Sequence, residues 1–265
     1  MISKPLFIRN MKQTLKPLFI FIMVLSMYTS VIVYMYDPSF MDILNDYQNA
    51  MPQVMSAFGM TGIATSLIEF MKVYLYGFLM LLFPMIFIII ITNSTIMKYI
   101  DSGSMANLLS TKNSRRKIIL TQCLSIVLGV ILLMVIMTTI GIFCCELMFS
   151  GELDIKKYIL LNFTTLLLQL VILGIAFLSA CVFNESKYYY AVGAGLPILF
   201  FLINMLSNMG DKLENLKYFT VYSLLPLNKI IEGAEVGAYN ITLAIIAIIL
   251  FILGIEIFKK RDLPL

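Results

Sequence analysis

Long uncharged stretches of apolar residues alternate with shorter polar segments along the chain. Six of these stretches approach or exceed the length of about 20 apolar residues that a helix needs to cross a bilayer. Glu256, one residue from the end of the last stretch, is the only charged residue in them. The stretches are Leu18–Tyr36, Val73–Ile91, Ile118–Cys145, Tyr158–Phe183, Tyr188–Ser207 and Ile241–Ile257. This pattern predicts an all-α integral membrane protein with six transmembrane helices in a single domain, residues 1–265.

Composition supports this prediction and excludes a soluble domain. Of the 265 residues, 60% are hydrophobic and 13% are charged, whereas soluble domains average about 45–50% apolar and about 25% charged residues. Too few polar groups are present to cover the surface of a soluble fold. The first stretch follows four basic residues but lacks a small-residue cleavage site, so we expect a retained signal anchor.

The basic residues predict the orientation of the bundle, because short loops rich in Lys and Arg stay in the cytoplasm. With the N-terminus inside, the inner segments hold most of the 19 basic residues and only four acids, Asp101, Glu185, Glu256 and Asp262. The inner basic residues are Lys4, Arg9, Lys12, Lys16, Lys98, Lys112, Arg115, Arg116, Lys117, Lys187, Lys259, Lys260 and Arg261. We therefore expect both termini to be cytoplasmic, in a bacterial cell membrane.

Two long outer loops, residues 37–72 and 208–240, are expected to contain short helices. In the first, the apolar run from Met51 to Met60 is too short to span and favours an interfacial helix. In the second, the apolar run Tyr218–Leu227 is consistent with a pair of short helices that dip into the membrane, or with a plain surface loop.

The sequence lacks the groups that most enzymes and ion-coupled carriers need. It has no Gly-x-x-x-x-Gly-Lys-[Ser/Thr] phosphate loop and no histidine, and no charged residue lies in the middle of a predicted span. Asn162, Gln169 and Asn204 are best interpreted as interhelical hydrogen-bond partners. The four cysteines lie in apolar surroundings without metal-ligand spacing. We expect no catalytic residue, bound metal, bound cofactor or nucleic-acid partner.

The only long inner loop carries the most informative motif. Asp101 or Ser102 is a candidate N-cap for a helix over residues 101–113, in which Met105, Leu108 and Leu109 form an apolar stripe. Ser114 is a candidate N-cap for the next span, and the basic triplet after it is an anchor near lipid headgroups. The loop is thus either a positively charged connection between two spans or a helix that docks into a cytoplasmic partner.

Three segments of the chain resemble permeases of the ABC-2 transporter family. The inner loop combines Asp101-x-Gly103-Ser104, Leu108-Leu109-Ser110-Thr111 and Ser114-Arg115-Arg116-Lys117-Ile118. The apolar run Met51–Gly59 before the second span and the tail Phe258–Leu263 are also similar to the family. One departure is that Met105-Ala106-Asn107 stands where family members commonly have a Glu.

The resemblance implies an ABC-2 (type V exporter-like) fold and a set of functional residues. Such permeases pair with a second permease copy or a homologue and with two cytosolic ATPases, which bind ATP and Mg. A coupling helix and an amphipathic N-terminal helix, here residues 3–16, transmit ATPase closure. The first, second and fifth spans line the pathway at the dimer interface. The implied residues are Asp101, Ser104, Asn107, Leu108, Leu109, Lys112 and Arg115 for ATPase docking, Arg9, Lys12 and Lys16 on the N-terminal helix, and Gly193, Gly195, Pro197 and Asn204 on the fifth span.

Within this family, small permeases often export hydrophobic peptides, bacteriocins or drugs, and the resemblance extends to exporters of phenol-soluble modulins. Two other classes remain open: a membrane sensor or scaffold that holds a cytosolic protein, and a secondary carrier that uses Glu146 or Glu256 for proton exchange. Because Glu256 lies three and four residues before Lys259 and Lys260, a surface ion pair is the expected role of Glu256.

Overall fold

The computed structural model describes residues 2–60, 64–110, 113–210 and 213–261. Over these residues the chain is helical and contains no strand. Six helical segments are long and apolar enough to cross a membrane, which confirms the predicted all-α membrane fold. They are α1 (Lys4–Tyr34), α5 (Leu79–Thr92) with η2 (Asn93–Met97) and α6 (Lys98–Asp101), α8 (Arg115–Met148), α9 (Ile155–Val182), α10 (Ser186–Tyr189) with η3 (Tyr190–Ala194) and α11 (Gly195–Ser207), and α13 (Gly237–Lys260).

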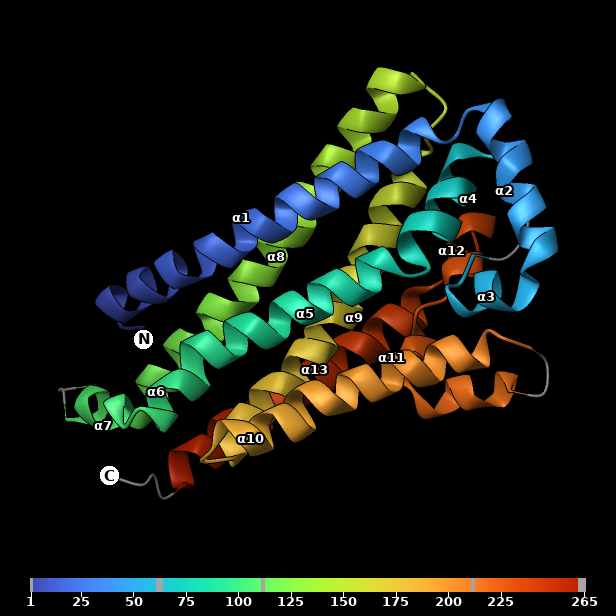
Figure 1. Cartoon of the computed structure of the whole chain (residues 1–265). Helices are drawn as coiled ribbons and strands as arrows, with labels where there is room; N and C mark the ends of the chain where they lie inside the picture. The colour runs from blue at the N-terminus through green and yellow to red at the C-terminus, as the bar shows by residue number, and fades with distance from the viewer. Residues whose placement is uncertain (1, 61–63, 111–112, 211–212, 262–265) are drawn as a thin grey trace.

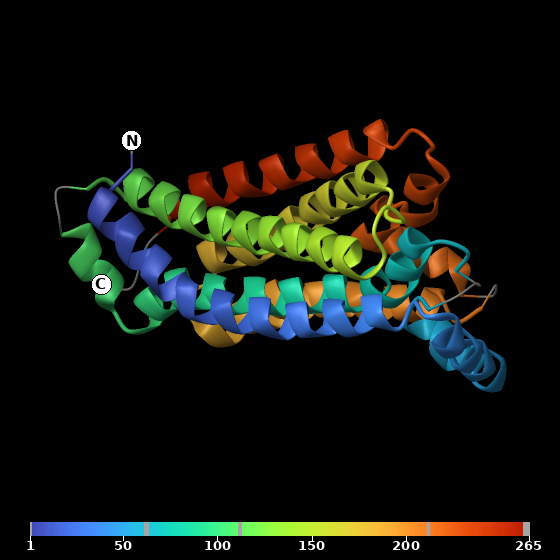
Figure 2. The same ribbon diagram turned by 90° about the horizontal axis from the view of Figure 1, so that it is seen from above.

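The long helices form an elongated bundle with two different ends (Figure 1). The start of α1, α6, α7, α10 and the end of α13 gather at one end, here called the N/C end. The remaining short elements lie at the other end, here called the opposite end, where α2 projects away from the bundle (Figure 2). Helix α7 at the N/C end comprises Ser104–Leu109. The short elements at the opposite end are α2 (Pro38–Ala50), α3 (Pro52–Ala57), α4 (Leu67–Met71), η1 (Lys72–Tyr76), η4 (Glu214–Phe219), η5 (Val221–Leu224) and α12 (Leu227–Glu232).

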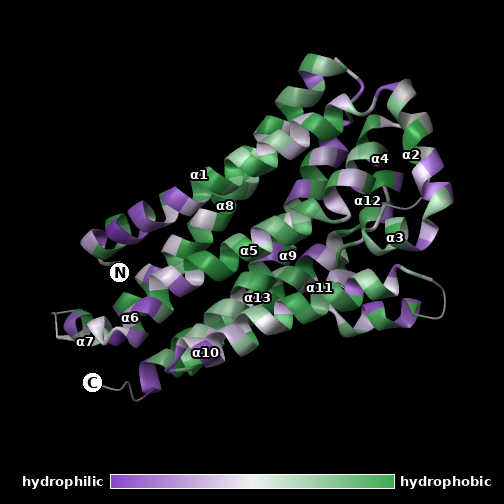
Figure 3. Cartoon of the chain, viewed as in Figure 1, coloured by the Kyte–Doolittle hydropathy of each residue, from purple (hydrophilic) through white to green (hydrophobic). Residues whose placement is uncertain are grey.

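Hydrophobic residues cover the middle of the long helices, and hydrophilic residues gather near both ends (Figure 3). The helices extend past the apolar runs that predicted them, because a helix continues through the interface into water. Helix α8, for example, begins at Arg115 rather than at the first apolar residue, Ile118. Ser114 accepts a hydrogen bond from the Lys117 backbone N–H, which confirms Ser114 as the N-cap.

Glycines bring the central helices into close contact. A Cβ on Gly174 of α9 would lie 2.9 Å from Leu250 Cβ of α13, and one on Gly254 of α13 would lie 2.7 Å from Phe177 Cε1 of α9. Helices in a membrane associate by such close packing because lipid supplies no hydrophobic driving force between them. Helices α9 and α13 are therefore closely packed against each other.

The N-terminal helix is not a separate interfacial element, which corrects the predicted break between residues 3–16 and a span at 18–36. Helix α1 runs without interruption from Lys4 to Tyr34, through Pro17. Its first turns pack on the protein: Leu6 is buried, and the Ser3 backbone N–H donates to Thr121 Oγ1 of α8 at 3.0 Å. Packing against α8 keeps the helix continuous although Pro17 removes one backbone donor.

The second span is irregular, and polar side chains of other helices compensate for it. Pro84 lacks an N–H, so the Met80 carbonyl one turn earlier has no helical donor. Gln169 Nε2 of α9 donates to the Met80 and Leu81 carbonyls, at 3.2 Å each. Further along, Gln122 Nε2 of α8 donates to the Thr95 carbonyl in η2 at 2.8 Å. The predicted interhelical role of Gln169 is confirmed.

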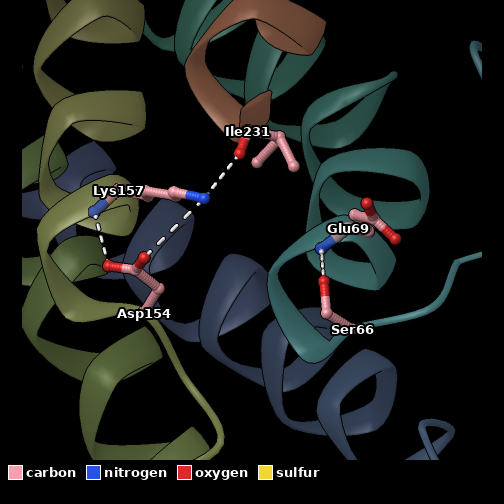
Figure 4. A network of polar contacts seen from close by, with 5 residues as sticks. All are labelled: Ser66, Glu69, Asp154, Lys157 and Ile231. Carbon is pink, nitrogen blue, oxygen red and sulfur yellow. Dashed lines mark hydrogen bonds and ion pairs between the residues drawn. The ribbon is translucent and has the colours of Figure 1, made fainter. Parts of the chain in front are cut away.

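The segment after the fifth span folds into the bundle rather than forming a plain surface loop. Tyr222 in η5 and Ile230 in α12 are buried, and the Tyr222 hydroxyl lies 3.7 Å from Met85 Sδ of α5. Lys157 of α9 holds α12 in place by donating to the Ile231 carbonyl at 2.7 Å (Figure 4). The described residues of this segment thus pack onto the bundle at the opposite end.

Candidate functional site

The candidate docking helix is shorter than predicted and is positioned by its own chain. Helix α7 comprises Ser104–Leu109 rather than 101–113, and its N-cap residue is Gly103, not Asp101 or Ser102. Gly103 has φ 66°, a left-handed conformation that favours glycine and turns the chain sharply between α6 and α7. Lys112 lies outside the described residues. The short helix α7 therefore follows the end of the second span after a sharp turn.

Asp101 joins the two inner loops. Instead of capping α7, it ends α6, and its carboxylate accepts hydrogen bonds from the Ser186 backbone N–H at 3.0 Å and from the Ser186 hydroxyl. Ser186 begins α10, at the start of the fifth span. No local sequence pattern pairs these two residues, because they are 85 positions apart. The contact thus joins the end of α6 to the start of the fifth span.

Two residues of the predicted apolar stripe of α7 face the bundle rather than a partner. Met105 is only 2% exposed, and Leu108 is partly buried and packs against the core. The side chain of Leu109, the third residue of the stripe, lies outside the described part of the structure. Ser104 is half-buried, and Asn107 is exposed. Among the predicted docking residues of α7 whose side chains the structure describes, Asn107 is therefore the one that is exposed.

Arg115 is also engaged within the chain. Its guanidinium donates to the Arg261 carbonyl at 2.7 Å, and Arg261 in turn donates to the Cys181 carbonyl at 2.8 Å and to Asn184 Oδ1 at 2.8 Å. Partial burial lowers the pKa of Arg261 from its ordinary value. The two arginines tie the start of α8 and the end of α13 to the end of α9. Sequence reasoning missed this role of Arg261, although the residue directly follows the last span.

The three predicted basic residues of α1, Arg9, Lys12 and Lys16, are exposed. The Arg9 guanidinium lies 5.3 Å from the centre of the Tyr99 ring of α6, a cation–π contact. Gln13 Nε2 donates to the Tyr99 hydroxyl at 3.4 Å. These contacts connect the start of α1 to the element that carries α7.

Of the fifth-span residues, Gly193 makes the close approach that its size predicts. A Cβ there would lie 2.9 Å from Ser179 Cβ of α9, whereas a Cβ on Gly195 would meet only the Tyr190 carbonyl, at 3.5 Å. Pro197 is buried and follows the π-helical turn η3, and both proline and a π-helical turn are recognised causes of a kink in a helix. Asn204 is half-buried and lines a cavity at the opposite end.

The interior of the bundle is polar near the N/C end but carries no charge. Asn10, Thr14, Thr92, Thr95 and Gln122 are fully buried on α1, α5, η2 and α8. Within the described residues, every buried side chain that bears a polar group is uncharged. Glu256 lies at the surface, 3.5 Å from Lys259, as expected for a surface ion pair. No ion-coupling carboxylate is therefore held inside the described part of the bundle.

The comparisons with known proteins agree with this architecture. Residues 7–263 match the family described as ABC-2 family transporter protein. No curated protein and no solved structure matches the chain.

Proposed function

Because the chain belongs to the ABC-2 transporter family and is thus the membrane-embedded permease subunit of an ABC transporter, not its ATPase, we propose that it is half of an exporter driven by cytosolic ATPases. Members of this family generally partner with ATP-binding subunits. In the proposed complex, two permease chains, identical or homologous, form the pathway. Two ATPase subunits bind ATP and Mg and dock at the N/C end, which faces the cytoplasm of a bacterial cell.

The arrangement of α7 is the observation that carries this proposal. In this helix Asn107 is exposed, Met105 is buried against the bundle, and the turn at Gly103 connects the helix to the second span. The Asp101–Ser186 contact connects the same point to the fifth span. A partner that moves α7 therefore moves the second and fifth spans together, which is what ATP-driven opening of a pathway between them requires.

The proposed orientation rests on the charges at the N/C end. Arg9, Lys12, Lys16, Arg116 and Lys260 are exposed there, as basic residues on a cytoplasmic face are expected to be. The ion pair between Lys187 and Glu185 is also at this end. The proposed docking surface consequently carries an excess of positive charge next to α7.

A hydrophobic or amphipathic cargo, such as a peptide toxin, a bacteriocin or a drug, fits the interior best. Buried polar groups near the N/C end are amides and hydroxyls, which form hydrogen bonds without demanding a charged substrate. Export of an amphipathic peptide needs such an uncharged route, and an ion-coupled carrier would need an ionisable group inside the bundle.

Transport into inside-out vesicles that contain the permease and its ATPase tests the proposal. We expect uptake of an amphipathic peptide that requires hydrolysable ATP. Asn107→Arg is expected to abolish ATPase association and uptake without unfolding the chain, because Asn107 is exposed. The matched control, Glu235→Arg, places the same charge on an exposed residue at the opposite end and should retain both activities. If Asn107→Arg binds the ATPase and transports normally, α7 is not the docking element.

A further inference from the structure

A cavity of about 550 Å³ lies at the opposite end of the bundle, remote from the proposed ATPase surface. Its wall is built from the start of the second span, the end of the fifth span and the segment that joins the fifth span to α13. Cavities of about 300–1,000 Å³ are typical of small-molecule binding sites. The space is therefore sufficient for the polar headgroup of a lipid.

The cavity is lined by three lysines from three different elements, and none of the described residues that line it carries a carboxylate. Lys72 of η1 donates to Asn228 Oδ1 at 3.0 Å, and Lys229 of α12 donates to the Tyr239 hydroxyl at 2.8 Å. Both partners are neutral, so they orient the ammonium groups without cancelling their charge.

Two carboxylates lie near the lysines, and both are engaged beside the cavity. Glu69 accepts hydrogen bonds from the Thr65 backbone N–H at 2.7 Å and from the Thr65 hydroxyl at 2.6 Å, and these bonds lower the pKa of Glu69. Glu214 pairs with Lys217 at the surface, an arrangement that contributes little binding energy because water screens it. Among the described residues, the three lysines that line the cavity outnumber these two carboxylates, and this part of the cavity therefore carries a net positive charge.

The backbone shapes this cavity closely. Gly59, with φ 71°, packs against Gly77, so that a Cβ on Gly59 would lie 3.0 Å from Gly77 Cα. Lys157 anchors α12, and therefore Lys229, through its bond to the Ile231 carbonyl (Figure 4). The lysines are thus presented by elements that other parts of the fold hold in position.

Aromatic side chains place the cavity near the boundary between lipid and water. Tyr218, which lines it, is 71% exposed, and the adjacent Phe219 is 73% exposed. Exposed aromatic residues at the end of a helical bundle typically lie at the level of lipid headgroups. Lysine ammonium groups bind phosphate as point charges, and basic pockets between transmembrane helices bind lipid headgroups.

From this geometry we propose that the cavity binds the phosphate of an anionic phospholipid headgroup, with Lys72, Lys217 and Lys229 as its cationic ligands. The bound lipid connects the second and fifth spans and α12 through one shared anion. Its placement in the outer leaflet rests on the proposed orientation, but the binding itself does not.

Lipid binding to the purified full chain in a neutral detergent tests this proposal, with native mass spectrometry as the readout. The probes are phosphatidylglycerol, phosphatidylcholine and inorganic phosphate. We expect phosphatidylglycerol to bind more tightly than phosphatidylcholine, and Lys72→Gln/Lys229→Gln to weaken it by about 30-fold, the loss expected for two lysines close to an anionic lipid. The matched control is Lys156→Gln, an exposed lysine at the same end that does not line the cavity, and it should bind phosphatidylglycerol normally.

Two results would overturn the proposal: undiminished phosphatidylglycerol binding by the double variant, or inorganic phosphate binding as tightly as the lipid, which would assign the site to a free anion. If the double variant does not fold, Lys217→Gln, at a partly exposed residue, provides the same test with an expected loss of about fivefold. Neither experiment involves ATP or the ATPase, so failure here leaves the proposed transport function standing.

Discussion

Replacing Gly193 with alanine adds a methyl group where α9 leaves no space for it. The new Cβ would lie 2.9 Å from Ser179 Cβ and 2.9 Å from Tyr189 Cε2. Both neighbours are buried, and the Tyr189 hydroxyl is held by the Ile89 carbonyl at 2.9 Å, so neither moves freely. The same substitution at Gly195 would meet only the Tyr190 carbonyl at 3.5 Å, an ordinary contact.

The expected magnitudes follow from this difference. Overpacking a filled interior costs about 1–3 kcal/mol, while alanine in place of glycine in a helix gains about 0.5–1 kcal/mol. Gly193→Ala should therefore destabilise the protein by up to about 2.5 kcal/mol, and Gly195→Ala should stabilise it by up to about 1 kcal/mol. Because the helix-propensity gain is common to both variants, the difference between them, about 1–3 kcal/mol, measures the clash alone.

Thermal unfolding of both variants in the same detergent measures this difference. A change of 1 kcal/mol shifts Tm by about 2–4 °C for a domain of about this size, so the two midpoints should differ by about 2–12 °C, with Gly193→Ala lower. Equal midpoints would refute the reasoning, since they would mean that the fifth span does not pack on α9 at Gly193.

Three further outcomes follow from contacts inside the bundle. Gln169→Leu should lower the free energy of unfolding by about 1–2 kcal/mol, because two carbonyls of the second span lose their donor; an unchanged unfolding midpoint would contradict the compensation at Pro84. Asp101→Ala should cost less than about 1 kcal/mol of stability, because the side chain is exposed, yet it should reduce ATP-driven transport while ATPase co-purification persists. Glu256→Gln should leave transport unchanged, because it removes only a surface ion pair with Lys259; a large loss would favour proton coupling.

The six spans were predictable because hydropathy reports directly on the cost of burying charge in lipid. Their number and order are readable from charge-free runs such as Ile118–Cys145. Helix ends were less predictable, since residues such as Arg115 continue a helix beyond the apolar run. The predicted break in α1 is wrong. Pro17 and the change from basic to apolar residues resemble the end of one helix and the start of another. In the structure, packing of Ser3 and Leu6 against the protein stabilises one continuous helix.

The candidate site was only partly predictable, because its key contacts join distant residues. The sequence identifies the α7 segment but does not show which way its apolar side chains face. An apolar stripe that contains Met105 can pack into a groove on a partner or, as the structure shows for Met105, into the protein's own core. Likewise, nothing in the sequence pairs Asp101 with Ser186 or places Lys72 and Lys229 around one cavity. Such pairings depend on how the spans pack in three dimensions.

Chemical cross-linking from α7 tests most directly whether a separate ATPase operates this chain. The four native cysteines are buried or half-buried in the helices, so a cysteine introduced at exposed Asn107 provides a distinct site for a thiol-reactive linker. We expect Asn107→Cys to cross-link to the ATPase subunit in membranes and Ala238→Cys, exposed at the opposite end, to give no such product. A cross-link from Ala238→Cys, or none from Asn107→Cys in a complex that transports, would contradict the account.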